Sequence, residues 1–157
     1  APGVRRGFAA ERFASLPSGI WQMERQRAGD LVKKDVTFRA FGSDNDPAAV
    51  RLAMANAEKA GVGGLCRAEV KDVGELALPE GRCVVITNPP YGERLLDIRQ
   101  AETLYKVLGQ RVPNEPGKRC YVITPDEDFE KIFGRKADKR RKLYNGMIKC
   151  QLYMYFK

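Results

Sequence analysis

The nine residues from Cys83 to Tyr91 constrain the fold of this chain more than any other stretch. They read Cys-Val-Val-Ile-Thr-Asn-Pro-Pro-Tyr. The β-branched run 84–86 does not alternate with polar residues, which predicts a strand buried on both faces of a parallel sheet. Because the two prolines have no N–H to donate and restrict the residue before them, the strand must end there in a rigid loop. In open α/β sheets, ligands bind at the carboxyl ends of the strands.

Strand and helix patterns alternate along the rest of the chain, with short connections. The expected helices cover residues 20–32, 47–60, 101–110 and 127–133, and the other expected strands cover residues 36–42, 65–70, 119–124 and 148–156. Pro47 fits the first position of a helix, with Asp46 as its N-cap. The basic run 135–142 leads into a turn, and Asn145-Gly146 between two strand-like runs predicts an antiparallel hairpin. The pattern predicts a doubly wound α/β fold, mostly parallel, with helices on both faces.

Length and composition indicate one globular domain over residues 1–157. Hydrophobic residues make up 43% and charged residues 31% of the chain, which is ordinary for a protein with a packed core. The sequence shows no apolar stretch of membrane-spanning length and no signal-peptide core at its start. We therefore expect a cytoplasmic protein.

The cysteine and histidine content limits the chemistry. The sequence has no histidine, which excludes Ser-His and Cys-His hydrolases and histidine-containing metal sites. The four cysteines lack C-x-x-C spacing, and each lies in or beside an expected strand. They are Cys66, Cys83, Cys120 and Cys150. Buried free thiols are expected, with no metal site.

The formal net charge of +8 favours a polyanionic partner such as a nucleic acid. Solvated lysines alone would explain the same charge.

Two aspartates follow expected strands and point to a nucleotide. Asp44 comes after the strand 36–42, where α/β nucleotide-binding folds place an acid that binds ribose hydroxyls. Asp72 follows the strand 65–70, where a carboxylate can accept a hydrogen bond from an adenine amino group. The glycine-rich stretch 61–64 follows a helix and precedes a strand, so it is interpreted as a helix C-cap and not as a phosphate loop.

Asn88-Pro89-Pro90-Tyr91 resembles the NPPY catalytic motif of the S-adenosylmethionine-dependent amino-methyltransferases, which methylate exocyclic amines of bases or the glutamine side-chain amide. The resemblance implies that the Asn88 side-chain oxygen and the Pro89 carbonyl accept hydrogen bonds from the target NH₂ and aim its lone pair at the cofactor methyl group. It also implies that Tyr91 stacks on a base taken out of its helix. The alternative interpretation is a proline-rich turn with a surface tyrosine.

The resemblance extends along the whole chain and is most specific for one family. The sequence is similar to the bacterial 23S ribosomal RNA guanine-N2 methyltransferases, a family also named N6-adenine DNA methylases. The similar segments, in order, are Ala1-Pro2-Gly3-x-x-Arg6-x-Phe8, Gly42-Ser43-Asp44-x-Asp46, Ala60-Gly61-Val62, Asn88-Pro89-Pro90-Tyr91-Gly92-Glu93-Arg94-Leu95, Tyr105-x-x-x-Gly109 and Tyr144-Asn145-Gly146. The resemblance implies S-adenosylmethionine as cofactor, bound by Asp44, Asp72 and Asn88, and RNA or DNA as substrate.

In that family, a first strand with a glycine-rich loop and an RNA-binding domain precede the segment that matches Ala1. The resemblance therefore implies a class I methyltransferase sheet lacking its first strand here, which a preceding segment or a partner chain completes. We expect the isolated 157-residue chain to bind S-adenosylmethionine weakly or not at all. Three alternatives to a ribosomal guanine methyltransferase stay open: a DNA adenine methyltransferase, a protein-glutamine methyltransferase, and a non-catalytic module that binds RNA or a partner.

Overall fold

The computed structural model describes residues 6–91 and 98–156. Its internal contacts divide the chain into two compact units. The first unit consists of Ala1–Gly42 with Ala48–Ala68, and the second of Ser43–Pro47 with Glu69–Lys157.

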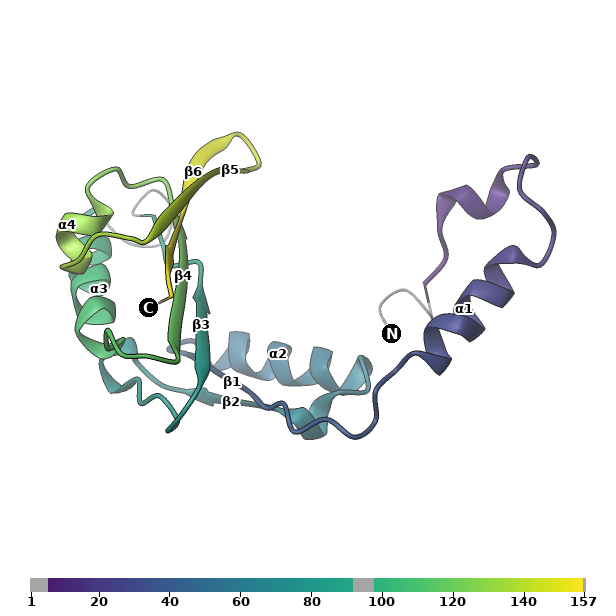
Figure 1. The fold of residues 1–157 in the computed structure, drawn as a ribbon, viewed down its shortest axis with the longest axis horizontal. Coiled ribbons are helices and arrows are strands. Elements are labelled where there is room, and N and C mark those ends of the chain that lie inside the picture. The colour runs from purple at the N-terminus through teal and green to yellow at the C-terminus, as the bar shows by residue number, and fades with distance from the viewer. Residues whose placement is uncertain (1–5, 92–97, 157) are drawn as a thin grey trace. The chain divides into compact units, whose positions relative to one another are not determined.

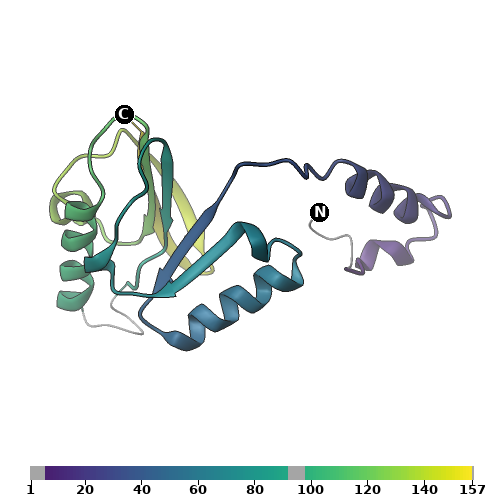
Figure 2. The same cartoon turned by 90° about the horizontal axis from the view of Figure 1, so that it is seen from below.

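The first unit contains most of a two-stranded parallel sheet and of a long helix, while the carboxyl ends of both strands belong to the second unit. In Figure 2, helix α2 runs alongside the β1–β2 pair. The strand expected over residues 36–42 begins later, at Ala40, and ends with Asp44 itself. The elements in chain order are η1 (Ala9–Arg12), α1 (Ile20–Asp30), β1 (Ala40–Asp44), α2 (Pro47–Lys59), η2 (Gly63–Leu65) and β2 (Cys66–Val70).

The second unit contains a four-stranded mixed sheet in the order β3-β4-β6-β5 (Figure 1). Strand β3 is parallel to β4, and β6 is antiparallel to both β4 and β5. The fold expected from the sequence, a methyltransferase-type α/β sheet that closes with an antiparallel hairpin, is therefore confirmed. The elements are η3 (Val73–Glu75), β3 (Cys83–Thr87), α3 (Ile98–Arg111), β4 (Lys118–Thr124), α4 (Phe129–Phe133), β5 (Lys139–Asn145) and β6 (Ile148–Tyr155).

The core of this unit lies between the sheet and helices α3 and α4. Alternate residues of β4 point to the helices, so that Val122 is fully buried. Helix α3 contributes its apolar stripe, in which Tyr105 is 1% exposed. The two helices approach so closely at Gly109 that an added Cβ would lie 2.0 Å from the main-chain oxygen of Phe133. The buried residues of this core are Ala101, Tyr105, Leu108, Val112, Cys120, Val122, Phe129, Phe133, Tyr153 and Tyr155.

The opposite face of the four-stranded sheet differs from the expectation. Val84 is 55% exposed and Ile86 is 79% exposed, although the sequence predicted a strand buried on both faces. Both side chains alternate with Val85, which packs against the core on the helical side. Within the described part of this unit, helices cover one face of the sheet, so the expected second helical layer is absent from it.

The C-terminal hairpin forms where the sequence predicted it, and the helix before it starts later than predicted. Strands β5 and β6 pair from Asn145↔Ile148 onward, so Gly146 and Met147 form the two-residue loop. Gly146 has φ +62°, as the first central position of a type II′ turn requires. The strand-like run before the turn is strand β5, Lys139–Asn145, which includes the second half of the basic run. Helix α4 begins at Phe129, two residues later than expected.

No helix within residues 6–91 and 98–156 is long and apolar enough to cross a membrane. All four cysteines lie in strands, as expected, and all are free thiols. Cys120 and Cys150 are buried, whereas Cys66 and Cys83 are half-buried. The same residue ranges contain no group of histidine, cysteine or acidic side chains able to hold a metal ion.

Candidate functional site

The loop after β3 presents a polar side chain at the carboxyl edge of the sheet. Strand β3 ends at Thr87 and Asn88 follows directly, with its side chain exposed. The next residue, Pro89, is buried. Because Pro89 and Pro90 cannot donate to a neighbouring strand, the ladder between β3 and β4 ends at Thr87↔Val122. The predicted position of Asn88 is therefore confirmed.

Tyr91 turns back onto Asn88 and orients its amide. The Tyr91 hydroxyl donates a hydrogen bond to Asn88 Oδ1 at 2.5 Å. Two groups of the β5–β6 hairpin donate to the same phenol oxygen: Asn145 Nδ2 at 3.4 Å and Cys150 Sγ at 3.9 Å. Burial, the largest influence, raises the pKa of Tyr91, so the phenol keeps its proton at neutral pH. The hairpin, Tyr91 and Asn88 thus form one directed chain of hydrogen bonds, which fixes the Asn88 amide with its oxygen toward the Tyr91 hydroxyl.

A buried hydrogen-bond network connects the same loop to helix α3 and strand β4. The Tyr105 hydroxyl of α3 donates to the Pro90 carbonyl at 2.9 Å and contacts Thr124 Oγ1 at 3.1 Å. Thr124 Oγ1 in turn accepts from the Asp126 main-chain N–H at 3.2 Å. Tyr105 and Thr124 are 1% and 0% exposed, and burial raises the pKa of Tyr105. Since buried polar groups need partners, this network fixes the position of the Pro90 carbonyl relative to α3 and β4.

Asp44 and Asp72 lie at the carboxyl ends of β1 and β2 and are both exposed. The two strand ends are joined by a hydrogen bond from the Lys71 N–H to the Asp44 carbonyl, at 2.9 Å. Each side chain is held by a local turn: Asp44 Oδ1 accepts from the Asp46 N–H at 2.9 Å, and Asp72 Oδ1 accepts from the Gly74 N–H at 2.7 Å. Two carboxylates in fixed positions at adjacent strand ends can accept hydrogen bonds from hydroxyl and amino groups of a ligand.

The structure links one of these acids to the core under the loop. Asp72 is the N-cap of η3, which packs against α3. Val73 contacts the core, and a Cβ added to Gly74 would lie 3.9 Å from Val107 Cγ1. Asp44 and Asn88, in contrast, lie at the ends of strands that belong to separate sheets in the described part of the chain. The candidate site therefore has two ordered parts: the Asn88–Tyr91 loop, and the pair of carboxylates.

Sequence reasoning missed the residues that position this loop. The sequence places Tyr105 in a segment similar to the family, Asn145 in the predicted hairpin turn, and Thr124 and Cys150 in predicted strands, and it assigns none of them a role at the loop. Their contacts with the loop join residues 15 to 59 positions apart in the chain. One signal was available, because a tyrosine in the apolar stripe of a helix needs a partner for its hydroxyl. The residues Gly92-Glu93-Arg94-Leu95 of the extended motif lie outside the described ranges.

Comparison with known proteins supports the family expected from the sequence. The family model of the RMKL-like methyltransferase domain, UPF0020, matches residues 1–154. YpsC of Bacillus subtilis, named as a proposed RNA methyltransferase, is 36% identical over 156 residues, which are 99% of this chain and 40% of YpsC. The ribosomal RNA large subunit methyltransferase K/L of Shewanella frigidimarina is 33% identical over 160 residues, covering 99% of this chain and 22% of that enzyme. The chain thus spans less than half the length of these relatives.

Two crystal structures share the fold. SMU.472, named as a candidate methyltransferase and complexed with SAH, has a TM-score of 0.90 and 35% identity, covering 99% of this chain and 41% of the other. A Listeria monocytogenes protein, named as a predicted N6-adenine-specific DNA methylase, has a TM-score of 0.86 and 36% identity, covering 99% and 40%. Since the family model matches almost the whole chain and these similarities run along its full length, the chain belongs to the RMKL-like family of methyltransferase domains.

Proposed function

We propose that the protein transfers a methyl group from S-adenosylmethionine to an exocyclic amine of a nucleic-acid base, and that the base is guanine, methylated at N2, in large-subunit ribosomal RNA. The observation that carries this proposal is the Asn88 side chain, exposed at the carboxyl end of β3 with its oxygen oriented by the Tyr91 hydroxyl. The names of the relatives from Bacillus and Shewanella support RNA as the substrate class.

The loop has the acceptors that such a reaction needs. An exocyclic amine is a poor nucleophile because its lone pair is delocalised into the ring, and hydrogen bonds that draw its protons out of the ring plane localise that pair. An amide oxygen has two lone pairs. Asn88 Oδ1 uses one for the Tyr91 hydroxyl and has a second for the amine, while the Pro89 carbonyl is the second acceptor in this proposal. The Tyr91 ring offers a face on which the base can stack.

The carboxylate pair fits the nucleoside part of the cofactor. S-adenosylmethionine, when bound, supplies the electrophilic methyl group. In this proposal Asp44 accepts hydrogen bonds from the ribose hydroxyls, Asp72 accepts one from the adenine amino group, and Asn88 also lies against the cofactor. Both carboxylates are exposed and held by main-chain N–H groups, so they need no reorganisation to accept a ligand. The SAH bound to SMU.472, a structure of the same fold, supports this assignment.

A DNA adenine methyltransferase is the second candidate. The name of the Listeria structure favours it, and two acceptors facing an NH₂ group do not distinguish guanine from adenine. The intact protein should be incubated with methyl-labelled S-adenosylmethionine and either large-subunit ribosomal RNA or duplex DNA. Mass analysis of the nucleosides then identifies the product. We expect N2-methylguanosine in the RNA, whereas N6-methyladenine in the DNA would establish the second candidate.

Substitution of Asn88 tests the role of the loop. Because Asn88→Ala removes an acceptor from the reacting amine, we expect kcat to fall by about 10²–10³-fold, the loss typical of one transition-state hydrogen bond. Asn114→Ala, at an exposed asparagine of the loop between α3 and β4, is the matched control and should retain wild-type kcat. Full turnover by Asn88→Ala would refute the role of the side chain. Absence of product from wild type with either nucleic acid would favour a non-catalytic module.

A further inference from the structure

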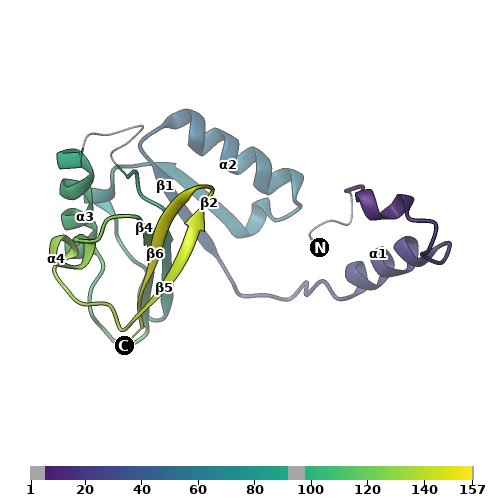
Figure 3. The ribbon, with the colours of Figure 1, turned by 90° about the horizontal axis from the view of Figure 1, so that it is seen from above.

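The β5–β6 hairpin lies directly beside the candidate site. Asn145, the last residue of β5, contacts the Tyr91 hydroxyl, and so does Cys150 of β6. The hairpin also continues past β4, because β6 begins at Ile148 whereas its pairing with β4 begins only at Gln151↔Thr124 (Figure 3). A nucleic acid whose base reaches Tyr91 must therefore run past this hairpin.

The hairpin is strongly basic. Residues 139–149 contain five lysines and arginines and no acidic residue. Four of these cations follow one another in β5, and all five side chains are exposed. Within the described ranges, no carboxylate pairs with Lys139, Arg141, Lys142 or Lys149. Their charges are therefore available to a polyanion.

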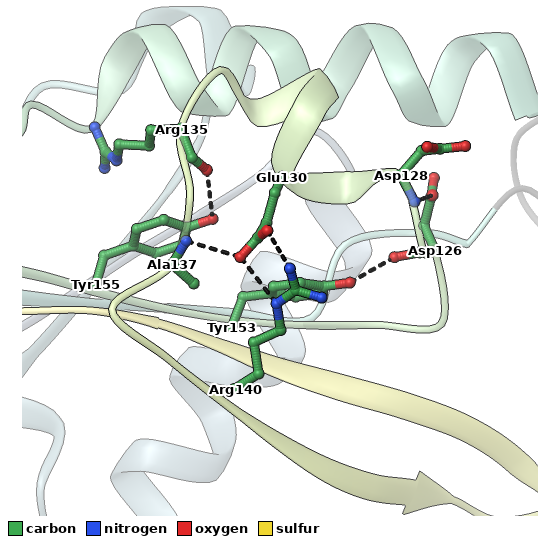
Figure 4. A network of polar contacts seen from close by, with 8 residues as sticks. All are labelled: Asp126, Asp128, Glu130, Arg135, Ala137, Arg140, Tyr153 and Tyr155. Atoms are coloured by element: carbon green, nitrogen blue, oxygen red, sulfur yellow. Dashed lines mark hydrogen bonds and ion pairs between the residues drawn. The ribbon is translucent and has the colours of Figure 1, made fainter.

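Arg140 is the exception, and it anchors the strand. Its guanidinium forms a two-point contact with the Glu130 carboxylate of α4, in which Nε lies 3.0 Å from Oε1, and it stacks 5.5 Å from the centre of the Tyr153 ring (Figure 4). Glu130 also accepts from the Ala137 N–H at 2.8 Å, just before β5 begins. This contact fixes β5 against α4 and leaves the neighbouring cations free to face solvent.

Two exposed side chains accompany the charges. Tyr144 is 62% exposed, with Lys142 Nζ 5.2 Å from its ring centre, and Met147 at the loop is 97% exposed. Cations on an edge strand can simply prevent edge-to-edge aggregation. An exposed tyrosine and methionine would oppose that purpose, because they promote association. Cations combined with an accessible aromatic ring are the pattern of surfaces that bind single-stranded nucleic acid.

We infer that the hairpin cluster, defined as Lys139, Arg141, Lys142, Tyr144 and Lys149, binds the RNA strand that carries the target base. The cations contact phosphates on either side of that base, and Tyr144 stacks on a neighbouring unpaired base. This inference rests on the proposed function, in that it takes the Asn88–Tyr91 loop as the place where the base enters.

The test removes three charges from the hairpin and compares them with three removed elsewhere. The hairpin variant is Lys139→Gln, Arg141→Gln and Lys142→Gln in the intact protein. The control variant is Lys106→Gln, Arg111→Gln and Lys131→Gln, three exposed cations on α3 and α4. Fluorescence anisotropy gives the Kd of each protein for a labelled single-stranded fragment of large-subunit ribosomal RNA, at several salt concentrations.

Each phosphate contact with a single strand contributes about 0.7 to the slope of log K against log salt. We expect the hairpin variant to lose about 2 from this slope and to bind about tenfold more weakly at 0.15 M salt. The control variant should keep the wild-type slope and a Kd within about twofold. Equal losses in both variants, or none in the hairpin variant, would overturn the inference. Such results would show that the charges of β5 only protect the sheet edge.

A second pair of variants tests stacking without changing charge. Tyr144→Ala should weaken RNA binding by about tenfold, and Tyr144→Phe should restore it, because the ring and not the hydroxyl makes the contact. Equal binding by both would remove Tyr144 from the cluster. These measurements need no cofactor, so they separate the inference from the proposed function. Salt-dependent RNA binding with no methyl transfer by wild type would overturn only the proposed function, whereas methyl transfer with an unchanged KM in the hairpin variant would overturn only the inference.

Discussion

The Tyr105→Phe substitution tests how the loop that carries Asn88 is supported. It removes one buried hydroxyl and keeps the ring, which packs edge-on against Phe129 with the two ring centres 5.2 Å apart. Because the Tyr105 hydroxyl donates its hydrogen bond to the Pro90 carbonyl, 2.9 Å away, the Thr124 hydroxyl must be the donor in its contact with the Tyr105 oxygen. Thr124 can then accept the Asp126 N–H, as observed. The substitution therefore leaves a buried donor and a half-buried acceptor without partners.

An unsatisfied buried donor or acceptor costs about 1–3 kcal/mol. The Thr124 hydroxyl bears the full cost because Thr124 is 0% exposed, whereas solvent can partly replace the partner of the Pro90 carbonyl. We expect the free energy of unfolding to fall by about 2 kcal/mol in total. With a typical urea m-value of about 2 kcal/mol/M, the midpoint should shift down by about 1 M.

Urea unfolding of the intact protein, followed by circular dichroism, measures this shift. Tyr144→Phe, which removes a hydroxyl from a tyrosine that is 62% exposed, is the control and should change stability by less than about 0.5 kcal/mol. The double variant Thr124→Val with Tyr105→Phe should be less destabilising than the sum of the two single variants by about 1 kcal/mol. The reason is that each single variant leaves the hydroxyl of the other residue without its partner, whereas the double variant removes both hydroxyls. A Tyr105→Phe midpoint equal to that of the control would show that the network does not hold the loop.

Three further predictions concern packing, pH and the site. Gly109→Ala should lower the free energy of unfolding in urea by about 2 kcal/mol or more, because the added Cβ would lie 2.0 Å from the Phe133 main-chain oxygen of α4. Gly29→Ala in helix α1, where the added Cβ meets no atom, should be neutral or stabilising, and the reverse order would contradict the α3–α4 contact. Burial raises the pKa of Cys120 from 9.0 to about 11, so the unfolded state loses the thiol proton at a lower pH than the folded state, and the free energy of unfolding should fall as pH rises from about 9 to 11. Cys120→Ala should flatten that fall, and an unchanged pH profile of stability would contradict the contribution of Cys120. Tyr91→Phe should lower kcat by about tenfold with little change in KM, because it keeps the ring but removes the hydrogen bond that orients the Asn88 amide. An unchanged kcat would exclude this role of the Tyr91 hydroxyl.

Local sequence was sufficient for the elements whose pattern is short-range. The β-branched run before Asn88 predicted β3, and the prolines predicted where it ends, because proline geometry acts on adjacent residues. Pro47 predicted the start of α2, and the glycine of Asn145-Gly146 predicted the hairpin, since both express backbone preferences of single residues. The family, too, was predicted from short motifs along the chain, each formed by residues close together in the sequence.

Tertiary structure alone decided the contacts that make the loop a site. Strand β5 has a highly charged sequence with little intrinsic preference for a strand, and it forms because β6 pairs with its backbone. Only the folded chain brings Asn145 and Tyr105, 54 and 15 positions away from their partners, to the phenol of Tyr91 and the carbonyl of Pro90. The sequence determined which groups are chemically competent, because competence belongs to the side chain itself. Their mutual orientation depends on hydrogen bonds across the fold, which no local pattern of residues encodes.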